Sequence, residues 1–192
     1  MDIKNFKSSR AGKVIKTERD YSAFVPHSLP PDIEYSSGLI NLLAEANRHI
    51  GNLNGVGILL PNPNLLIIPY MRREAVLSSK IEGTQTSLSE LFYFEAARKE
   101  EQKSEAQKTD VLEVINYVKA MDYGIKRLKE LPICLRLMRE IHEILMKNVR
   151  GQHLTIGEFR RSQNWIGPAG CNLNEAKYVP PPVHEMHATL GE

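Results

Sequence analysis

Apolar residues recur at helical spacing through most of the chain, and this period constrains the fold more than any other feature. Residues 39–53 form one stripe at intervals of three and four residues, and residues 111–128 and 137–145 form two more. Such stripes are typical of amphipathic helices that pack one face into a core. The pattern therefore predicts an all-α fold built as a helical bundle.

Residues that interrupt, end or begin helices divide the first half of the chain. Residues 55–70 interrupt the helical period with glycines and prolines, which predicts a loop. Pro69 can begin the next helix, because its missing N–H costs nothing at the first helical position, and Gly83 can end it in a left-handed conformation. Ser87 and Glu90 form a capping box that starts another helix. We therefore expect a helix over about 69–83 and a break before residue 87.

The second half begins after a solvated, charged stretch at residues 98–108. Asp110 and Glu113 form an N-cap pattern, which predicts that a helix begins there, and Leu131-Pro132 predicts the boundary to the next helix. These signals place the domain boundary between residues 104 and 105, giving an N-terminal domain at 1–104 and a second domain at 105–192.

One segment near each end of the chain looks extended, although the last ten residues, VHEMHATLGE, could open a helix. Near the C-terminal end, NWIG and KYVPPPV predict a short hairpin over about 163–180, which must stop at the prolines and lie at an edge. Another chain could pair with such an edge. At the other end, we expect residues 1–20 to form a frayed terminus and residues 21–36 an extended segment draped over the helices.

Composition excludes several classes of protein. With 192 residues, 42% hydrophobic residues and a net charge of +2, the chain has neither a disordered composition nor the broad basic character of a nucleic-acid binder. No stretch approaches the roughly 18 apolar residues that span a bilayer, so no membrane association is expected. Two cysteines, Cys134 and Cys171, favour a reducing compartment, and we expect a cytoplasmic protein.

Few residue patterns suggest chemistry. Neither a phosphate-binding glycine loop nor a G-x-S-x-G elbow is present, and no further ligand pair accompanies His184 and His187, so we expect no metal site. Ser78 and Glu82 share one helix face. An acid at the C-terminal end of a helix is unfavourable by about 0.3–1 kcal/mol. Glu82 therefore needs either solvent exposure or a cationic partner.

Four segments, AFVPHSLPP, LLPNPNLLIIPYMRREAVLSSKIEGTQTSLSELF, GEFRRSQNWIGPAG and YVPPPVHEM, resemble the Fic family, in the subgroup with an inhibitory helix before the Fic domain. Its most specific motif, S/T-x-x-x-E-G/N, is matched by Ser78, Glu82 and Gly83. The resemblance implies a helical fold with a short β-hairpin flap. It also implies a protein adenylyltransferase, which transfers AMP from ATP to a Ser, Thr or Tyr hydroxyl of a target protein.

The resemblance also implies roles for individual residues. Glu82 would be the inhibitory glutamate, which pairs with an arginine of the nucleotide site, and Ser78 would support it one turn earlier. The flap would bind the target by strand pairing through Ile166, Gly167, Tyr178 and Val179, with Ile166 and Val179 as the clamp side chains. ATP and Mg²⁺ are expected as the nucleotide and metal of the complete family enzyme.

The chain departs from the family at the catalytic motif H-[PF]-F-x-[DE]-G-N-G-R-x-x-R, which residues 1–192 do not contain. We therefore assign no catalytic residue, and we expect this N-terminal domain and first part of a Fic domain to be inert alone, without tight binding of ATP or Mg²⁺. The alternative is a short interaction protein that binds or inhibits a complete Fic domain in trans. A helical binding module without a link to nucleotides, and a homo-oligomer, also remain open.

Overall fold

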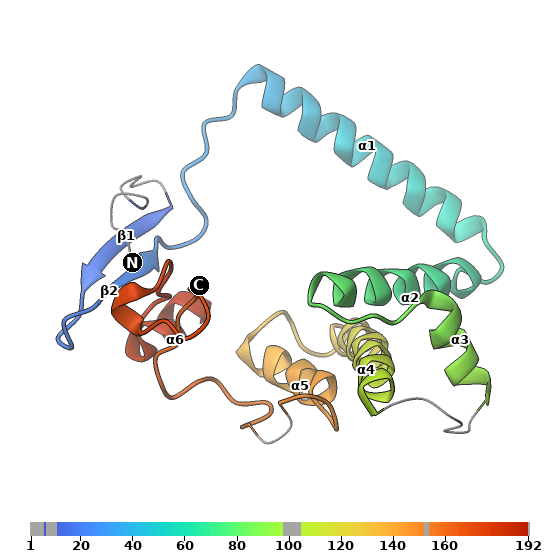
Figure 1. Ribbon diagram of the computed structural model, residues 1–192. Helices are drawn as coiled ribbons and strands as arrows, with labels where there is room; N and C mark the ends of the chain where they lie inside the picture. Colours follow the sequence, from blue (N-terminus) through green and yellow to red (C-terminus); the bar gives the residue numbers. More distant parts are fainter. Residues whose placement is uncertain (1–5, 7–10, 98–104, 152–153, 192) are drawn as a thin grey trace. The chain divides into compact units, whose positions relative to one another are not determined.

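The computed structural model describes residues 6, 11–97, 105–151 and 154–191. It divides into two compact units, unit 1 (residues 1–33 and 158–192) and unit 2 (residues 34–157). Most of the described chain is helical, with one small two-stranded hairpin, which confirms the predicted fold class (Figure 1). Among the described residues, no helix has both the length and the apolar character needed to cross a membrane.

Unit 2 is a helical bundle centred on α4. Its helices are α1 (Ser37–Leu59), α2 (Asn64–Ile81), α3 (Leu88–Ala97), α4 (Glu105–Arg127) and α5 (Leu135–Leu145). The central helix α4 contacts α2, α3 and α5. Ala75 and Val76 of α2 pack with Leu91 of α3 and Val114 of α4, and these four buried side chains form the core. The predicted stripe at residues 111–128 therefore faces the core at its start, where Val114 is buried, but Ile125 and Leu128 at its end are exposed.

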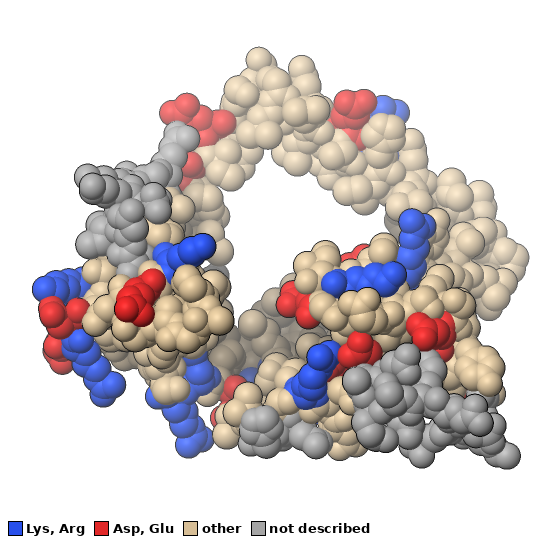
Figure 2. Space-filling view, viewed as in Figure 1, with Lys and Arg blue, Asp and Glu red and all other residues tan. Residues whose placement is uncertain are grey.

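Helix α1 is the exception, because it buries none of its residues. It begins at the N-cap Ser36, whose Oγ accepts a hydrogen bond from the amide of Leu39 at 3.2 Å. The apolar stripe predicted at 39–53 does form a helix, but its side chains are exposed, Leu53 by 74%. Figure 2 shows few charged side chains along α1.

The predicted loop at residues 55–70 is wrong over most of that range. Helix α1 continues to Leu59, α2 begins at Asn64, and only residues 60–63 connect them. The Asn62 side chain accepts a hydrogen bond from the Asn64 amide at 3.1 Å, which starts α2 before Pro69. Pro69 therefore lies inside α2, near its N-terminal end, where it removes only one backbone hydrogen bond.

Two further predictions concern the helices on either side of residues 98–108. The capping box is confirmed: Ser87 N donates to Glu90 Oε2 at 2.8 Å, and Glu90 N donates to Ser87 Oγ at 3.2 Å. The predicted N-cap at Asp110 is wrong, because α4 begins at Glu105 and the Asp110 carboxylate has other partners. Residues 98–104, which end at the expected domain boundary, lie outside the described residues.

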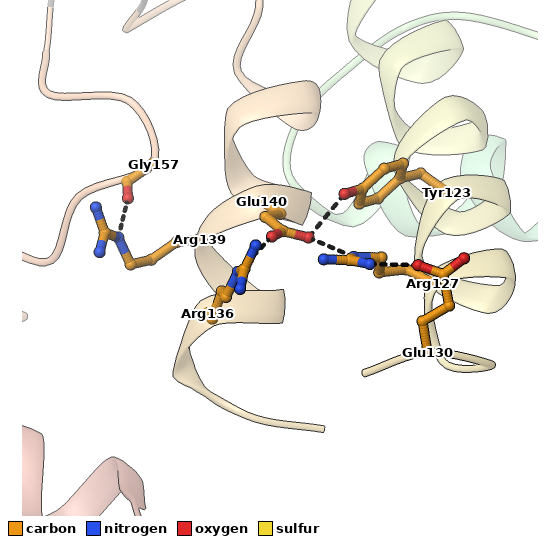
Figure 3. Close-up of polar contacts among 7 residues, drawn as sticks. All are labelled: Tyr123, Arg127, Glu130, Arg136, Arg139, Glu140 and Gly157. Atoms are coloured by element: carbon orange, nitrogen blue, oxygen red, sulfur yellow. Dashed lines mark hydrogen bonds and ion pairs between the residues drawn. The ribbon is translucent and has the colours of Figure 1, made fainter. Parts of the chain in front are cut away.

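A network of ion pairs between partly buried side chains joins α4 to α5 (Figure 3). The carboxylate of Glu140 accepts hydrogen bonds from Tyr123 Oη at 2.7 Å, Arg127 Nε at 3.0 Å and Arg136 Nε at 2.9 Å. Arg127 holds this carboxylate most strongly, and the pKa of Glu140 is lowered to about 2. The preceding residue, Arg139, donates from Nε to the Gly157 carbonyl at 2.7 Å.

Unit 1 combines the start of the chain with its end. Strands β1 (Gly12–Lys16) and β2 (Ser22–Pro26) pair antiparallel, with Val14 opposite Phe24. The short 3₁₀ helix η2 (Leu173–Glu175) and helix α6 (Val183–Gly191) complete the unit. The expected frayed terminus is therefore wrong for residues 12–20, since these form the hairpin, whereas residues 1–5 and 7–10 lie outside the described residues.

Candidate functional site

The helix that carries Ser78 and Glu82 ends as the sequence predicts. Glu82 is the C-cap of α2, and Gly83 has a φ of +98°. The Gly83 amide donates to the Lys80 carbonyl and the Thr84 amide to the Ser79 carbonyl, both at 3.1 Å. This pair of bonds is the Schellman motif, in which a left-handed residue closes the last turn. Gly83 therefore fixes the direction in which the chain leaves Glu82.

Ser78 and Glu82 lie on one side of α2 but do not contact each other. Ser78 Oγ donates instead to Glu74 Oε1, one turn earlier, at 2.7 Å. Glu82 is exposed, and no cation among the described residues contacts its carboxylate. Of the two alternatives for an acid at a helix end, unit 2 by itself shows solvent exposure.

Glu82 forms part of the wall of a cavity of about 500 Å³ in unit 2. Helix α2 contributes Ser78, Ser79 and Glu82, and the facing wall comes from α4, the last residue of α5 and the segment after it. The residues of that facing wall are Glu113, Tyr117, Leu145, Met146, Val149 and Arg150. The exposed surface of this cavity is largely apolar, and the charged groups in its wall are Glu82, Glu113 and Arg150.

Arg150 is the cation in this cavity wall, and acidic side chains of α4 already hold it. Its Nε donates to Glu113 Oε1 at 2.7 Å, and its Nη2 donates to Glu113 Oε2 and to Asp110 Oδ1, both at 2.9 Å. The Glu113 carboxylate raises the pKa of Arg150. Asp110 Oδ2 accepts a further hydrogen bond, at 2.9 Å, from the amide of Gln85.

This network connects the loop that follows Glu82 to helix α4. The helix end, the loop and the Arg150 segment are therefore held together by charged groups. Sequence reasoning missed the network, because Asp110 and Arg150 lie far apart in the chain and Asp110 fits an N-cap pattern equally well. Helical periodicity reports which face is buried, but it does not report which charged side chains meet.

The predicted flap contains one antiparallel bridge, between Ile166 and Tyr178. The Ile166 amide donates to the Tyr178 carbonyl at 2.9 Å, and the Tyr178 amide donates back at 3.1 Å. Gly167 allows a close approach, since a Cβ there would lie 2.5 Å from Cys171 Sγ. Trp165 Nε1 donates to the Cys171 carbonyl at 3.1 Å, which holds the loop against the bridge.

The structure places the two expected clamp side chains differently. Ile166 is 66% exposed, whereas Val179 is 0% exposed and packs with Tyr21, Ala23 and Ala176. The Phe24 amide of β2 also donates to the Val179 carbonyl at 2.9 Å. In unit 1, Val179 anchors the flap to the N-terminal hairpin, and Ile166 is the side chain available at the surface.

The N-terminal hairpin is the second feature that sequence reasoning missed. Tyr21 Oη donates to Gln163 Oε1 at 3.1 Å, and Gln163 Nε2 donates to the Pro180 carbonyl at 3.1 Å. These bonds tie the hairpin to both ends of the flap. Two short runs rich in β-branched and aromatic residues, GKVIK and SAFVP, carried the signal.

Residues 40–126 match the family model described as Fic/DOC family N-terminal. This match supports a Fic family protein with its N-terminal domain in this range. The matched range includes most of α1, all of α2 and α3 and nearly all of α4, and so contains Ser78, Glu82 and Gly83, whereas the flap lies outside it. No curated protein gives a significant match to the chain.

Proposed function

We propose that this Fic/DOC N-terminal domain, with its adjoining flap, controls the transfer of AMP from ATP to a hydroxyl side chain of a target protein. The family match over the segment that contains the Ser78-x-x-x-Glu82-Gly83 motif is the observation that carries the proposal. The flap would hold the target, and the end of α2 would hold the reaction in check.

Glu82 is the inhibitory group in this proposal. Its carboxylate stands at the negative end of α2 and has no cationic partner among the described residues, so it is free to accept a guanidinium. A charge-assisted pair with an arginine of a nucleotide site would be stronger when shielded from water than on the surface. Such a pair would remove that arginine from the phosphates of ATP.

Ser78 takes a different part from the one the resemblance implies. Its hydroxyl bonds to Glu74, so it fixes a second carboxylate on the same helix rather than Glu82 itself. We propose that this bond keeps Glu74 away from an incoming arginine and leaves Glu82 as its acceptor. The Schellman motif at Gly83 and the Asp110 bond to Gln85 would then hold the helix end in place.

The flap would bind an extended target segment by main-chain pairing next to Ile166, Gly167 and Tyr178. Main-chain hydrogen bonds give affinity and register, and exposed side chains give selectivity. Ile166, which is exposed, would contact the target, and the buried Val179 would keep the flap rigid.

The described residues do not fit a Mg²⁺ site. They contain no group of three or more His, Cys, Asp or Glu side chains that could hold a metal ion. The family motif that would supply an acidic ligand is also absent from residues 1–192. We therefore derive no step of the transfer through a metal in this chain, and its contribution is control and target binding.

The test provides the catalytic motif on a separate protein. A purified Fic domain with the complete catalytic motif, labelled ATP and Mg²⁺ are incubated with and without the chain, and the AMP incorporated into protein is measured. The chain should lower incorporation, and Glu82→Gly should abolish this inhibition. Glu130→Gln, which changes an exposed glutamate in the turn after α4, should inhibit as well as the parent chain.

Two outcomes would contradict the proposal. AMP transfer by the chain alone, above background, would show that it carries its own chemistry. Equal inhibition by Glu82→Gly and the parent would show that Glu82 is not the inhibitory group. Inhibition by the parent with retention of the Fic domain during purification would also support the alternative in which the chain acts in trans as a separate inhibitor.

A further inference from the structure

Unit 1 contains a cavity of about 660 Å³ between the turn of the N-terminal hairpin and the base of the flap. The hairpin contributes residues 15–19 and Tyr21, the segment before the flap contributes residues 161–163, and the start of α6 contributes residues 182–184. Polar groups make up most of this wall. The cavity therefore suits a charged or polar ligand better than an apolar one.

Hydrogen bonds hold the walls of this cavity in position. Thr17 Oγ1 donates to the Tyr21 carbonyl at 3.0 Å and closes the hairpin turn. The hydrogen bond from Tyr21 to Gln163 joins the turn to the base of the flap. Arg160 donates a hydrogen bond to the Pro181 carbonyl. Burial lowers the pKa of Arg160. Because the walls are tied to one another, a ligand would not have to order them.

The charge of the cavity wall is predominantly positive. Lys16, Arg19 and Arg161 line it together with a single acid, Glu18. Lys16 is already paired with Asp20 at 2.6 Å, whereas neither Arg19 nor Arg161 contacts a carboxylate among the described residues. Figure 2 shows basic and acidic side chains together at this end of unit 1. Two exposed guanidinium groups thus remain available for a carboxylate.

The position of the cavity indicates what kind of molecule carries that carboxylate. Gln163 in the cavity wall precedes Ile166 of the flap by three residues, which spans about 10 Å in an extended strand. A peptide that lies along the flap edge beside the Ile166 side chain would therefore reach the cavity with a side chain three or four residues away. A free small anion would gain nothing from this proximity.

We propose that this cavity binds acidic side chains of the target protein, three or four residues from the position that contacts the exposed Ile166 side chain. The N-terminal hairpin is then a specificity element, because it supplies Arg19 and fixes the flap through Tyr21. This inference rests on the proposed target-binding role of the flap, and its test uses binding rather than AMP transfer.

The experiment measures binding of two labelled ten-residue peptides to the full chain by fluorescence anisotropy. One peptide carries three glutamates, and the other carries glutamines at the same positions. The glutamate peptide should bind more tightly, and its affinity should fall as salt is raised. Arg161→Gln and Arg19→Gln should each weaken its binding about two- to fivefold, as the loss of one partly exposed ion pair predicts.

Lys13→Gln is the matched control, because Lys13 is an exposed cation of β1 that does not line the cavity. It should leave the affinity for the glutamate peptide unchanged. Equal affinity for the two peptides, or an equal loss with Lys13→Gln and Arg161→Gln, would overturn the proposal. Tighter binding of a single-stranded oligonucleotide of the same net charge would overturn the assignment to an acidic peptide.

A further variant separates this proposal from the proposed function of the flap. Ile166→Asp should weaken both peptides, because it places a charge at the pairing edge. If Ile166→Asp has no effect while Arg161→Gln still weakens the glutamate peptide, the role of the flap fails and the acidic-peptide cavity stands. If Ile166→Asp weakens both peptides and Arg161→Gln weakens neither, the flap stands and the cavity proposal fails.

Discussion

Arg150 and Glu113 form a two-bonded ion pair, with Nε to Oε1 at 2.7 Å and Nη2 to Oε2 at 2.9 Å. This parallel geometry requires a planar guanidinium, and an ammonium group cannot reproduce it. Because the same Nη2 also reaches Asp110, whose other oxygen accepts from the Gln85 amide, the pair stabilises the loop after Glu82.

Replacing the Arg150 guanidinium, which donates two parallel hydrogen bonds to Glu113, with the ammonium group of lysine should loosen the loop after Glu82. We expect Arg150→Lys to lower the free energy of unfolding by about 0.5–1 kcal/mol, a modest amount because the guanidinium is partly exposed. The more specific effect should be faster hydrogen exchange of the Gln85 amide. Arg136→Lys, at a single-bonded pair on α5, serves as the control and should leave Gln85 unchanged. Unaltered exchange at Gln85 in Arg150→Lys would refute the connection.

The pH dependence of stability should include a contribution from Glu140. Its pKa lies at about 2 in the folded chain, against an ordinary value of 4.5, because Arg127, Tyr123 and Arg136 hydrogen bond to the ionised carboxylate. Between these two values the unfolded chain binds more protons. The contribution is therefore complete above pH 4.5 and is lost as the pH falls towards 2.

Denaturant unfolding at a series of pH values tests this contribution. Glu140→Gln should flatten the loss of stability at acidic pH, whereas Glu45→Gln, at an exposed position on α1, should leave the slope unchanged. A slope in Glu140→Gln equal to that of the parent chain would contradict the assignment.

The end of α2 should depend on glycine at position 83. With a φ of +98°, any residue with a Cβ is strained there, and we expect Gly83→Ala to destabilise unit 2 by about 1 kcal/mol or more. Gly55→Ala is the control, because Gly55 lies within α1 with nothing near its Cβ position. Thermal unfolding followed by circular dichroism should show a lower midpoint only for Gly83→Ala.

The two flap side chains should behave in opposite ways. Val179→Ala removes two methyl groups from a fully buried site and should destabilise unit 1 by about 2 kcal/mol. Ile166→Ala alters an exposed side chain and should change stability by less than about 0.5 kcal/mol. Binding of an extended peptide should instead be weakened by Ile166→Ala. Equal destabilisation by the two variants would contradict the division into anchor and contact.

Local signals in the sequence correctly predicted the break between α2 and α3, where a helix-ending glycine is followed by a helix-starting capping box. Gly83 and the Ser87–Glu90 capping box both lie where the pattern places them, because each depends only on residues within one turn. Pro69 misled the prediction, since a proline is tolerated both at the start of a helix and shortly after it. Asp110 misled it as well, because an acid suits an N-cap and a distant arginine equally.

The candidate site was harder to predict from the sequence than the fold. Composition and period could not indicate that the hairpin at residues 12–26 covers Val179, because that contact joins segments more than 150 residues apart. For the same reason, the expected clamp at Val179 and the expected support of Glu82 by Ser78 were inferred without knowledge of their neighbours. The structure supplies those neighbours, Ala23 for Val179 and Glu74 for Ser78.

A double-mutant cycle tests the pairing of Glu82 with an arginine most directly. Inhibition of a complete Fic domain in trans is measured for Glu82→Gln, for substitution of each motif arginine by glutamine in that domain, and for the combinations. One arginine should couple to Glu82 by about 1.5–3 kcal/mol, so that the second substitution adds nothing once the first is made. Additive effects for both arginines would contradict the account.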